Sequence, residues 1–161
     1  MLVVDAMRAE DWPAVREVYA EGIVTGQATF EAHAPSWERW DADHLRDCRL
    51  VVRRDGRVIA WAALAPVSNR EVYRGVAEMS MYVAAAERGS GVGRTLGEAL
   101  VEASERAGIW TLDGWIFPEN EASLALCESF ACRVVGLRER LGKMGDRWRD
   151  VVLVERRSRV I

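Results

Sequence analysis

The chain has 161 residues, the size of one domain that can bury a hydrophobic core without disulfides or a metal. Its net charge is −3 and its arginines alternate with acidic residues, so the composition gives no support to nucleic-acid binding. No apolar segment has the length of a signal peptide or membrane span, and three cysteines without C-x-x-C spacing indicate free thiols. We therefore expect a single cytoplasmic domain over residues 1–161, with no metal site.

The N-terminal third predicts one strand and two helices. Residues 2–7 form a short apolar strand. Asp11 is placed to cap a helix with Pro13 in its first turn, and apolar residues then recur at helical spacing. Ser36 is placed to cap a second helix, whose apolar stripe reaches as far as Cys48.

The rest of the chain alternates strands and helices. Asp55-Gly56 is the strongest hairpin signal, so residues 50–54 and 57–64 predict two antiparallel strands. The later elements are expected as a strand at 76–83, a helix ending at Gly108, a strand at 109–116, a helix at 119–130, and two closing strands at 133–140 and 147–155. This order predicts a mixed sheet covered by helices, an α+β fold.

Three glycines, Gly89, Gly91 and Gly93, lie between the strand at 76–83 and the following helix. Glycine lets backbone amides approach a ligand, and a helix N-terminus attracts phosphate. The dinucleotide pattern G-x-G-x-x-G fails because its third glycine position holds Arg94, and the P-loop pattern fails because Gly89 and Gly93 are one residue too close. The spacing R-x-x-G-x-G from Arg88 suits a pyrophosphate, and a plain surface turn is the alternative.

The segment ERGSGVGRTL after EMSMYV resembles the acetyl-CoA signature of the GNAT N-acetyltransferases. The branch of phosphinothricin and methionine sulfoximine acetyltransferases is resembled by five further segments, namely ATFE at 28–31, GRVIAWAAL at 56–64, REVYRGVAEMSMYV at 70–83, PENEASLAL at 118–126 and RWRDVVL at 147–153. The resemblance covers nearly the whole chain. It implies a mostly antiparallel sheet of about six to seven strands flanked by about four helices, and a homodimer.

The resemblance implies that acetyl-CoA is the acyl donor. In the family, the end of the strand presents backbone groups to the pantetheine and the glycine loop holds the pyrophosphate. Asn120 matches an asparagine that reaches the CoA, although from the residues alone it is a helix cap. The implied donor site consists of Met81, Tyr82, Val83, Arg88, Gly89, Ser90, Gly91, Val92, Gly93, Arg94, Asn120 and Ser123.

Acetyl transfer to an amine with a pKa above about 8 requires a group that removes a proton. Strand alternation places Glu78 on one face of its strand with Ser80 and Tyr82. A mid-strand glutamate taken alone is more often solvent-facing or salt-bridged. The resemblance implies that Glu78 is the general base, because it matches the glutamate of the family's E-x-S-x-Y-V strand.

The acceptor side is read from the same resemblance. Arg70 and Tyr73 match the R-x-x-Y pair that lines the family's acceptor pocket, where a guanidinium can bind carboxylate or phosphinate oxygens bidentately. For Arg70, an ordinary loop arginine is the alternative. Phe30 and Glu31 match the family's Thr-Phe-Glu segment near the acceptor.

Two positions depart from the family pattern. Cys127 stands where the branch has a histidine and where other GNAT enzymes often have a tyrosine proposed to protonate the departing thiolate. We expect Cys127 to be mainly a packing residue, with at most a modest role as general acid. Lys143 lies one residue earlier than the family lysine. Both departures concern the acceptor, so acetyl-CoA is better supported as donor than phosphinothricin is as acceptor.

We therefore expect an N-acetyltransferase that moves acetyl from acetyl-CoA to the amine of a small amino-acid-like acceptor by direct attack in a ternary complex. One alternative is transfer to another amine, such as a polyamine, an antibiotic or a protein N-terminus, with Glu31 and Asp113 contacting a cationic acceptor. The other alternative is a CoA-binding module without catalysis. No nucleic-acid or membrane partner is expected.

Overall fold

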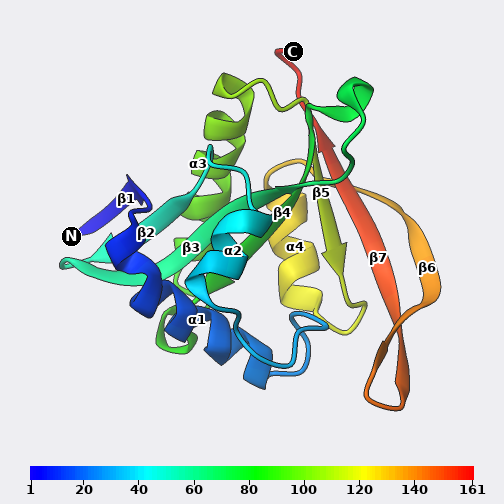
Figure 1. Cartoon of the computed structure of the whole chain (residues 1–161), viewed down its shortest axis with the longest axis horizontal. Helices are drawn as coiled ribbons and strands as arrows, with labels where there is room; N and C mark the ends of the chain where they lie inside the picture. The colour runs from blue at the N-terminus through cyan, green and yellow to red at the C-terminus, as the bar shows by residue number, and fades with distance from the viewer.

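The computed structural model describes residues 1–161 and contains one seven-stranded sheet with helices on both faces (Figure 1). In chain order the elements are β1 (Leu2–Ala6), η1 (Ala9–Asp11), α1 (Trp12–Val24), α2 (Trp37–Asp43), β2 (Leu50–Arg54), β3 (Arg57–Pro66), η2 (Glu71–Tyr73), β4 (Val76–Val83), η3 (Ala85–Glu87), α3 (Val92–Arg106), β5 (Thr111–Ile116), α4 (Glu121–Ser129), β6 (Arg133–Met144) and β7 (Arg147–Arg157). None of the helices combines the length and apolar composition that a bilayer crossing requires.

The strand order is β1-β2-β3-β4-β5-β7-β6, and every neighbouring pair is antiparallel except β4 with β5. The predicted α+β class and the mostly antiparallel sheet are therefore confirmed. The Asp55-Gly56 hairpin is also confirmed, with both residues at positive φ as such a tight turn requires.

Helices α1 and α2 cover one face of the sheet, and α3 and α4 cover the other (Figure 1). The face under α3 and α4 holds the larger core of 16 buried residues, and the opposite face holds a second core rich in aromatic side chains, including Trp12, Trp40 and Trp61. Strand β3 is buried from Ile59 to Leu64 because helices cover both of its faces. The two cores thus fix the middle of the sheet from both sides.

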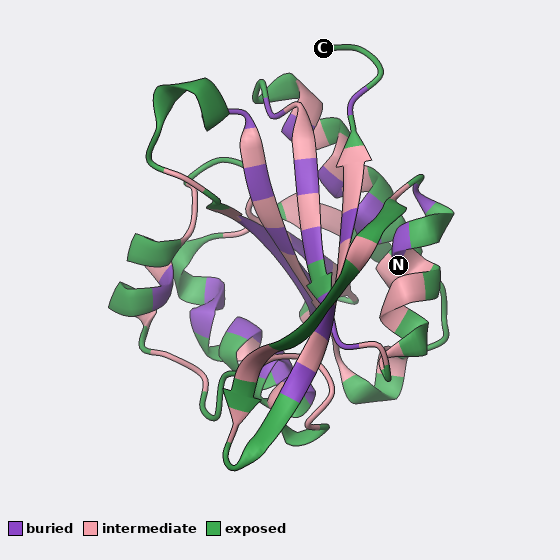
Figure 2. Ribbon diagram, turned by 90° about the vertical axis from the view of Figure 1, so that its right-hand side faces the viewer, coloured by how far each residue is buried: buried purple, intermediate pink, exposed green.

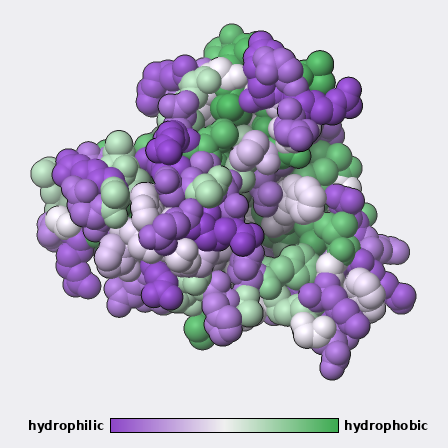
Figure 3. Space-filling model, viewed as in Figure 1, coloured by the Kyte–Doolittle hydropathy of each residue, from purple (hydrophilic) through white to green (hydrophobic).

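The β6–β7 end of the sheet is much more exposed than its middle (Figure 2). Both strands extend beyond their predicted ends, to Met144 and Arg157 respectively. Apolar side chains gather on this side of the molecule (Figure 3). The large exposed apolar residues on β5, β6 and β7 are Trp115, Val134, Val135, Leu137 and Trp148.

The two predicted helix caps have different outcomes. The Ser36 hydroxyl accepts a hydrogen bond from the Arg39 amide, so this cap is confirmed. Asp11 directly precedes α1, but its carboxylate caps nothing in that helix. It accepts two hydrogen bonds of 2.8 Å from the Arg53 guanidinium instead, because a charged partner on β2 binds it more strongly than a backbone amide would.

The prediction for the end of the second helix was wrong. Helix α2 ends at Asp43, so the apolar stripe expected to reach Cys48 does not exist as a helical face. The reason is the partly buried Arg49, six residues beyond the end of this helix. The Arg49 guanidinium donates to the carbonyl oxygens of Asp41, His44 and Leu45, which takes these acceptors out of a helical ladder.

Strands β4 and β5 are paired over only three positions, the last of which is Glu78 opposite Asp113. Beyond it β4 stays paired with β3 up to Val83, while β5 stays paired with β7 up to Ile116. The two strands therefore diverge (Figure 1). The edge of β4 from Met79 to Val83 has no strand beside it on the β5 side, and the candidate site lies there.

Candidate active site

A groove of about 800 Å³ begins at the free edge of β4 and runs between the N-terminal ends of α3 and α4. It includes ten of the twelve residues expected to bind the donor: Met81, Tyr82, Val83, Arg88, Gly89, Gly91, Gly93, Arg94, Asn120 and Ser123. The structure thus brings together the strand end, the glycine loop and the α4 cap, which are separated by up to forty positions in the sequence. 

The start of α3 has the features of an anion site. Gly91 occupies the N-cap position with φ 88°, a left-handed conformation that favours glycine. It has no side chain that could accept a hydrogen bond from the first helical amides. The first helical hydrogen bond runs from the Thr95 amide to the Gly91 carbonyl, so the amides of residues 92–94 have no partner within the helix. Unpaired amides at the positive end of a helix fit a phosphate group.

Two arginines border this loop. Arg88 folds back so that its Nε donates to the carbonyl of Val83 at 3.3 Å, which leaves its terminal nitrogens free. Arg94 is bonded to Glu98 one turn further along α3. The residues present therefore fit a pyrophosphate, with free amides and at least one uncommitted guanidinium.

Ser90 and Val92 are the two expected donor residues that do not line the groove. The Val92 side chain is buried in the core beneath α3, because it is the first residue on the inward face of that helix, so only its amide can serve a ligand. The Ser90 hydroxyl donates to the carbonyl of Glu87 and closes the turn that precedes the helix.

Asn120 is a helix cap, as the residues alone indicated. Its side-chain oxygen accepts from the Ser123 amide at 3.2 Å, and its side-chain nitrogen donates to the carbonyl of Gln27 at 3.1 Å. One side chain therefore both starts α4 and ties it to the loop after α1. Because Asn120 also borders the groove, the cap and the proposed CoA contact are compatible.

A second cavity of about 660 Å³ lies on the other side of the same strand edge. Phe30, Glu31, Glu78 and Cys127 all line it, so these four predicted residues are brought together. Aromatic rings form part of its wall. Two of them, Tyr82 and Tyr19, are stacked with ring centroids 4.7 Å apart.

The groove and the cavity meet end to end. Six residues line both: Ala28, Met81, Tyr82, Asn120, Ser123 and Leu126. A molecule in the groove and a molecule in the cavity would therefore touch the same short wall. This is the arrangement required for direct transfer of a group from one to the other.

Glu78 lies on the cavity side of this wall. Its carboxylate has no hydrogen-bond donor within the chain, and burial raises its pKa, as does the negative charge of Asp113. Residues on the same strand alternate as expected, because Met79 packs into the core under α3 while Tyr82 stacks on Trp61 in the opposite core. A half-buried, unpaired carboxylate in a cavity is suited to accept a proton.

Cys127 and Cys132 are in contact at the end of α4. The amide of Cys132 donates to the carbonyl of Cys127 and the amide of Ala131 to that of Glu128, and Ala131 has φ 70°. This is a Schellman motif, which brings the first and last side chains together. The contact with Cys132 and burial both raise the pKa of the Cys127 thiol, so this thiol stays protonated and packs against the core.

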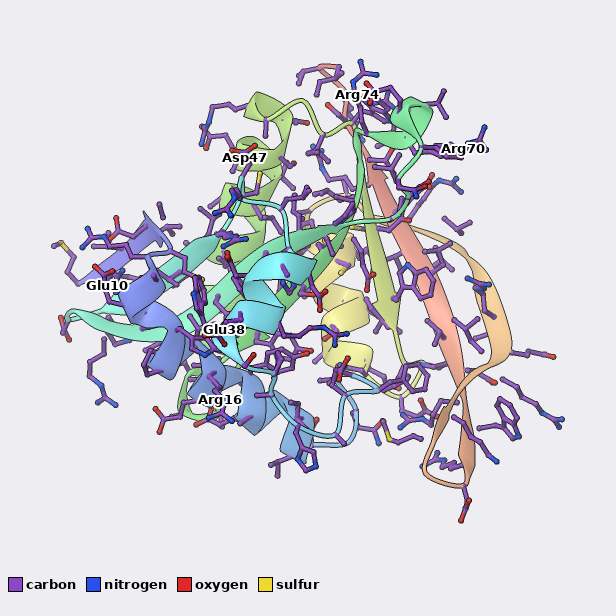
Figure 4. The ribbon with its side chains drawn as sticks, viewed as in Figure 1. Glu10, Arg16, Glu38, Asp47, Arg70 and Arg74 are labelled. Atoms are coloured by element: carbon purple, nitrogen blue, oxygen red, sulfur yellow. The ribbon has the colours of Figure 1, made fainter.

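Arg70 and Tyr73 are not among the residues that line the cavity. They belong to the turn around η2, where the Arg70 guanidinium lies 5.4 Å from the Tyr73 ring centroid. Arg70 points outward from this turn, on the same end of the molecule as Arg74 (Figure 4). Within one chain the structure therefore does not bring this pair to Glu78, and its role in acceptor binding stays a prediction.

Lys143 also lies away from the cavity. It is on the β6–β7 hairpin, with its Nζ 5.5 Å from the ring centroid of Trp148. The charged lining of the cavity is instead mostly acidic. It contains Glu31, Glu78 and an Arg39–Asp43 ion pair, and no other arginine or lysine.

The sequence analysis missed Arg149, whose side chain is only 2% exposed. Its guanidinium donates to the carbonyl of Gly26 at 2.9 Å and to the side chain of Gln27 at 2.7 Å, and lies 3.8 Å from the Phe117 ring centroid. It thereby fixes the loop that leads to Phe30. The strand alternation in RWRDVVLV was the available signal, because it places Arg149 on the inward face.

No group of three or more His, Cys, Asp or Glu side chains is arranged to hold a metal ion. Residues 8–131 match the sequence model of the acetyltransferase (GNAT) family. The chain belongs to the GNAT acetyltransferase family. It is an enzyme of acetyl-CoA-dependent acyl transfer, and the predicted family is confirmed.

Within the GNAT family, several similar proteins are named phosphinothricin or methionine sulfoximine acetyltransferases. The phosphinothricin N-acetyltransferase of Alcaligenes faecalis is 32% identical over 95% of this chain and 81% of its own length. The L-methionine sulfoximine/L-methionine sulfone acetyltransferase of Pseudomonas paraeruginosa is 26% identical over 90% of this chain and 88% of its own. A phosphinothricin acetyltransferase from Sinorhizobium meliloti, solved with acetyl-CoA, is 26% identical, with a TM-score of 0.86 over 97% of this chain and 88% of that one. The GNAT fold is therefore confirmed.

Proposed function

We propose that this GNAT enzyme transfers the acetyl group of acetyl-CoA to the amino group of a small amino-acid-like acceptor, of the phosphinothricin or methionine sulfoximine type. The observation that carries the proposal is the shared wall between the two cavities. A donor in the groove and an amine in the cavity can meet there, and Glu78 stands on the amine's side. The named relatives act on acceptors of this kind.

The mechanism is direct attack within a ternary complex, without an acyl-enzyme. The free amides at the start of α3, with Arg88, would hold the pyrophosphate, and the donor supplies an activated thioester. Glu78 accepts the proton of the attacking amine, directly or through water. The amine nitrogen forms the new C–N bond, the C–S bond of the thioester breaks, and CoA leaves as a thiolate that takes up a proton from solvent. Backbone amides at the open edge from Met81 to Val83 would stabilise the negative charge that develops on the carbonyl oxygen.

Replacing the base tests this mechanism. Glu78→Gln removes the proton acceptor while keeping the shape of the side chain, so turnover should fall by roughly 10²- to 10³-fold. The loss should be largest at pH values where wild-type Glu78 is ionised while the acceptor amine is still protonated, and it should shrink at lower pH, where the wild-type carboxylate takes up a proton itself. Acetyl-CoA affinity, measured by calorimetry, should stay within about twofold, because Glu78 does not line the donor groove.

The control for this experiment is Glu102→Gln on the exposed face of α3, which should leave turnover unchanged. Wild-type turnover in Glu78→Gln at every pH would contradict the assignment of the base. Tight acetyl-CoA binding without thiol release, for any acceptor tried, would instead favour a binding module.

One observation favours a second candidate, transfer to a cationic amine such as a polyamine. The cavity presents Glu31 and Glu78, and its one arginine, Arg39, is already bonded to Asp43. Carboxylates beside aromatic rings attract a cation, whereas a phosphinate requires an uncommitted positive group.

A panel of acceptors decides between the two candidates by thiol release from acetyl-CoA. Phosphinothricin and methionine sulfoximine represent the first class, and spermidine and an alanyl peptide represent other amines. We expect kcat/KM to be at least about tenfold higher for the amino-acid class, since tenfold corresponds to one well-placed charged contact. A preference for spermidine of the same size would overturn the first candidate.

The proposal also includes a single domain, a homodimer and a cytoplasmic location. The resemblance supports the dimer, and so do the exposed apolar side chains on β5, β6 and β7. The three free cysteines support a reducing compartment. Sedimentation equilibrium tests the dimer, since a mass of 18.1 kDa at all concentrations would exclude it.

A further inference from the structure

Four charged residues form one row across four neighbouring strands. Glu78 on β4 is opposite Asp113 on β5, Asp113 is opposite Glu155 on β7, and Glu155 is opposite Arg133 on β6. Residues directly opposite in a sheet point to the same face. From Glu78 to the edge strand β6, the row thus contains three acidic residues followed by one arginine.

The charges in this row are not evenly compensated. Arg133 donates to Glu155 at 2.7 Å, so the outer acid is paired. Glu78 and Asp113 have no hydrogen-bond donor and no ion-pair partner in the chain. Like charges directly opposite each other destabilise a sheet, so the unpaired acids Glu78 and Asp113 are together unfavourable for folding. One of the two is the proposed base.

No cation is directly opposite either acid of the pair. On its other side Glu78 is opposite Ala65 of β3, which is apolar. The arginine of β7 next to Glu155 on the same face as Asp113 is Arg157, which is opposite Thr111 and donates to the carbonyl oxygens of Trp110 and Ser158. The titratable or charged groups that face the same cavity are Tyr19 from α1, Glu31 and His33 from the loop, Arg39 and Asp43 from α2, His44 after α2, Tyr82 from β4 and Cys127 from α4. Arg39 is the one permanent cation among them, and it is bonded to Asp43.

We propose that Asp113 is a positioning residue for the acetyl transfer, whose negative charge one strand away strengthens Glu78 as the acceptor of the amine proton. Asp113 does not line the cavity, so it acts through Glu78 and does not touch the acceptor. The inference rests on the proposed role of Glu78 as base. It goes further because it assigns a function to the unpaired acid behind that base.

The direction of the pKa shifts of Glu78 and Asp113 agrees with this role. Asp113 raises the pKa of Glu78 in addition to the effect of burial, and burial together with Glu155 raises the pKa of Asp113. Strands in a sheet are about 4.8 Å apart, a distance at which two carboxylates interact even with partial solvent screening. An aspartate has the lower ordinary pKa of the two, so Asp113 ionises first and its charge then opposes ionisation of Glu78.

The test is Asp113→Asn, measured in two ways. Carboxyl-carbon NMR of the free enzyme should show the titration of Glu78 at a pH lower by about 0.5 to 1 unit, because the opposing charge is gone. The acidic limb of the kcat/KM profile should move down by the same amount. Turnover at the alkaline plateau should fall about two- to threefold, since Glu78 is then a weaker base.

Two further variants separate charge from shape. Asp113→Glu keeps the charge and should restore the Glu78 titration to within about 0.3 unit of wild type. Glu155→Gln removes a charge two strands away, about 10 Å from Glu78, and should move that titration by less than about 0.2 unit. Thermal unfolding should show Asp113→Asn to be at least as stable as wild type at pH 7.

The two readouts distinguish the possible failures. If the NMR titration of Glu78 is the same in Asp113→Asn as in wild type, the proposed role of Asp113 is wrong. If that titration moves but the kinetic limb does not, the coupling is real and Glu78 is not the kinetic base, which overturns the proposed function instead. Equal shifts in Asp113→Asn and Asp113→Glu would show an effect of shape and would also overturn the inference.

Discussion

Cys127 illustrates how the surroundings of one residue limit its chemistry. It borders the cavity where other family members have a candidate acid, yet its side chain is buried and in contact with Cys132. Both factors raise the pKa of its thiol. A thiol held protonated in this way can pack well, but its S–H is a weak donor to a departing thiolate.

We therefore expect Cys127→Ala to keep turnover within about twofold of wild type across the pH range, because no proton transfer depends on the thiol. It should lower the free energy of unfolding by about 1 kcal/mol through the small cavity it leaves. A pH–rate profile and denaturant unfolding measure both effects. Cys48→Ala, outside the cavity, is the control, and a tenfold loss of turnover in Cys127→Ala alone would restore the acid role.

At the scale of elements, helix α3 has glycines in left-handed conformation beyond both ends. Gly91 precedes it with φ 88° and Gly108 follows it with φ 80°, and an added Cβ would meet no neighbouring atom at either position. The two sites are therefore matched in backbone strain and in free space. They differ in that Gly91 borders the groove proposed for acetyl-CoA and Gly108 does not.

Alanine at either glycine should cost about 1 to 2 kcal/mol of stability, since each forces a side chain into a left-handed backbone. Only Gly91→Ala should also weaken acetyl-CoA binding, by about tenfold, because it displaces the free amides at the start of α3. Calorimetric titration with CoA and thermal unfolding provide the two readings. Equal loss of CoA affinity in Gly108→Ala would show that general destabilisation explains the effect.

At the scale of the whole molecule, Arg53 joins the first helical segment to the sheet. It donates to Asp11 with two hydrogen bonds of 2.8 Å and to Asp5 on β1 with one of 3.1 Å. The hydrogen bonds from Arg53 lower the pKa of Asp11 below its ordinary value. A lowered pKa adds stability at pH values above the ordinary value, and this stability is lost as the pH falls through the lowered value.

Asp11→Asn should therefore reduce the free energy of unfolding by about 1 to 3 kcal/mol at pH 7, because it leaves the partly buried guanidinium of Arg53 with a weaker partner. The difference from wild type should shrink as the pH falls below about 4, where the wild-type carboxylate also begins to take up a proton. Urea unfolding across this pH range measures it. An equal difference at pH 3 and pH 7 would contradict the ion-pair account, and Asp146→Asn at an exposed turn is the control.

The sequence predicted those parts of the molecule that depend on neighbouring residues. The hairpin at Asp55-Gly56, the Ser36 cap and the face of β4 that holds Glu78 all follow from local spacing, and the resemblance added ten residues that line one groove. Long-range contacts decided the rest. The end of α2 depends on Arg49, whose bonds to preceding carbonyls leave no periodic signal.

The divergence of β4 from β5 lets one strand take part in two kinds of recognition through different atoms. In the proposed site, the main chain along the open edge of β4 binds the donor, while the side chains of Glu78, Ser80 and Tyr82 face the acceptor. Main-chain groups are the same whatever side chain is present. Acceptor preference can therefore change by substitution along this strand, apart from the proposed base Glu78, without loss of the common donor, and variants selected for a new amine should keep their affinity for acetyl-CoA.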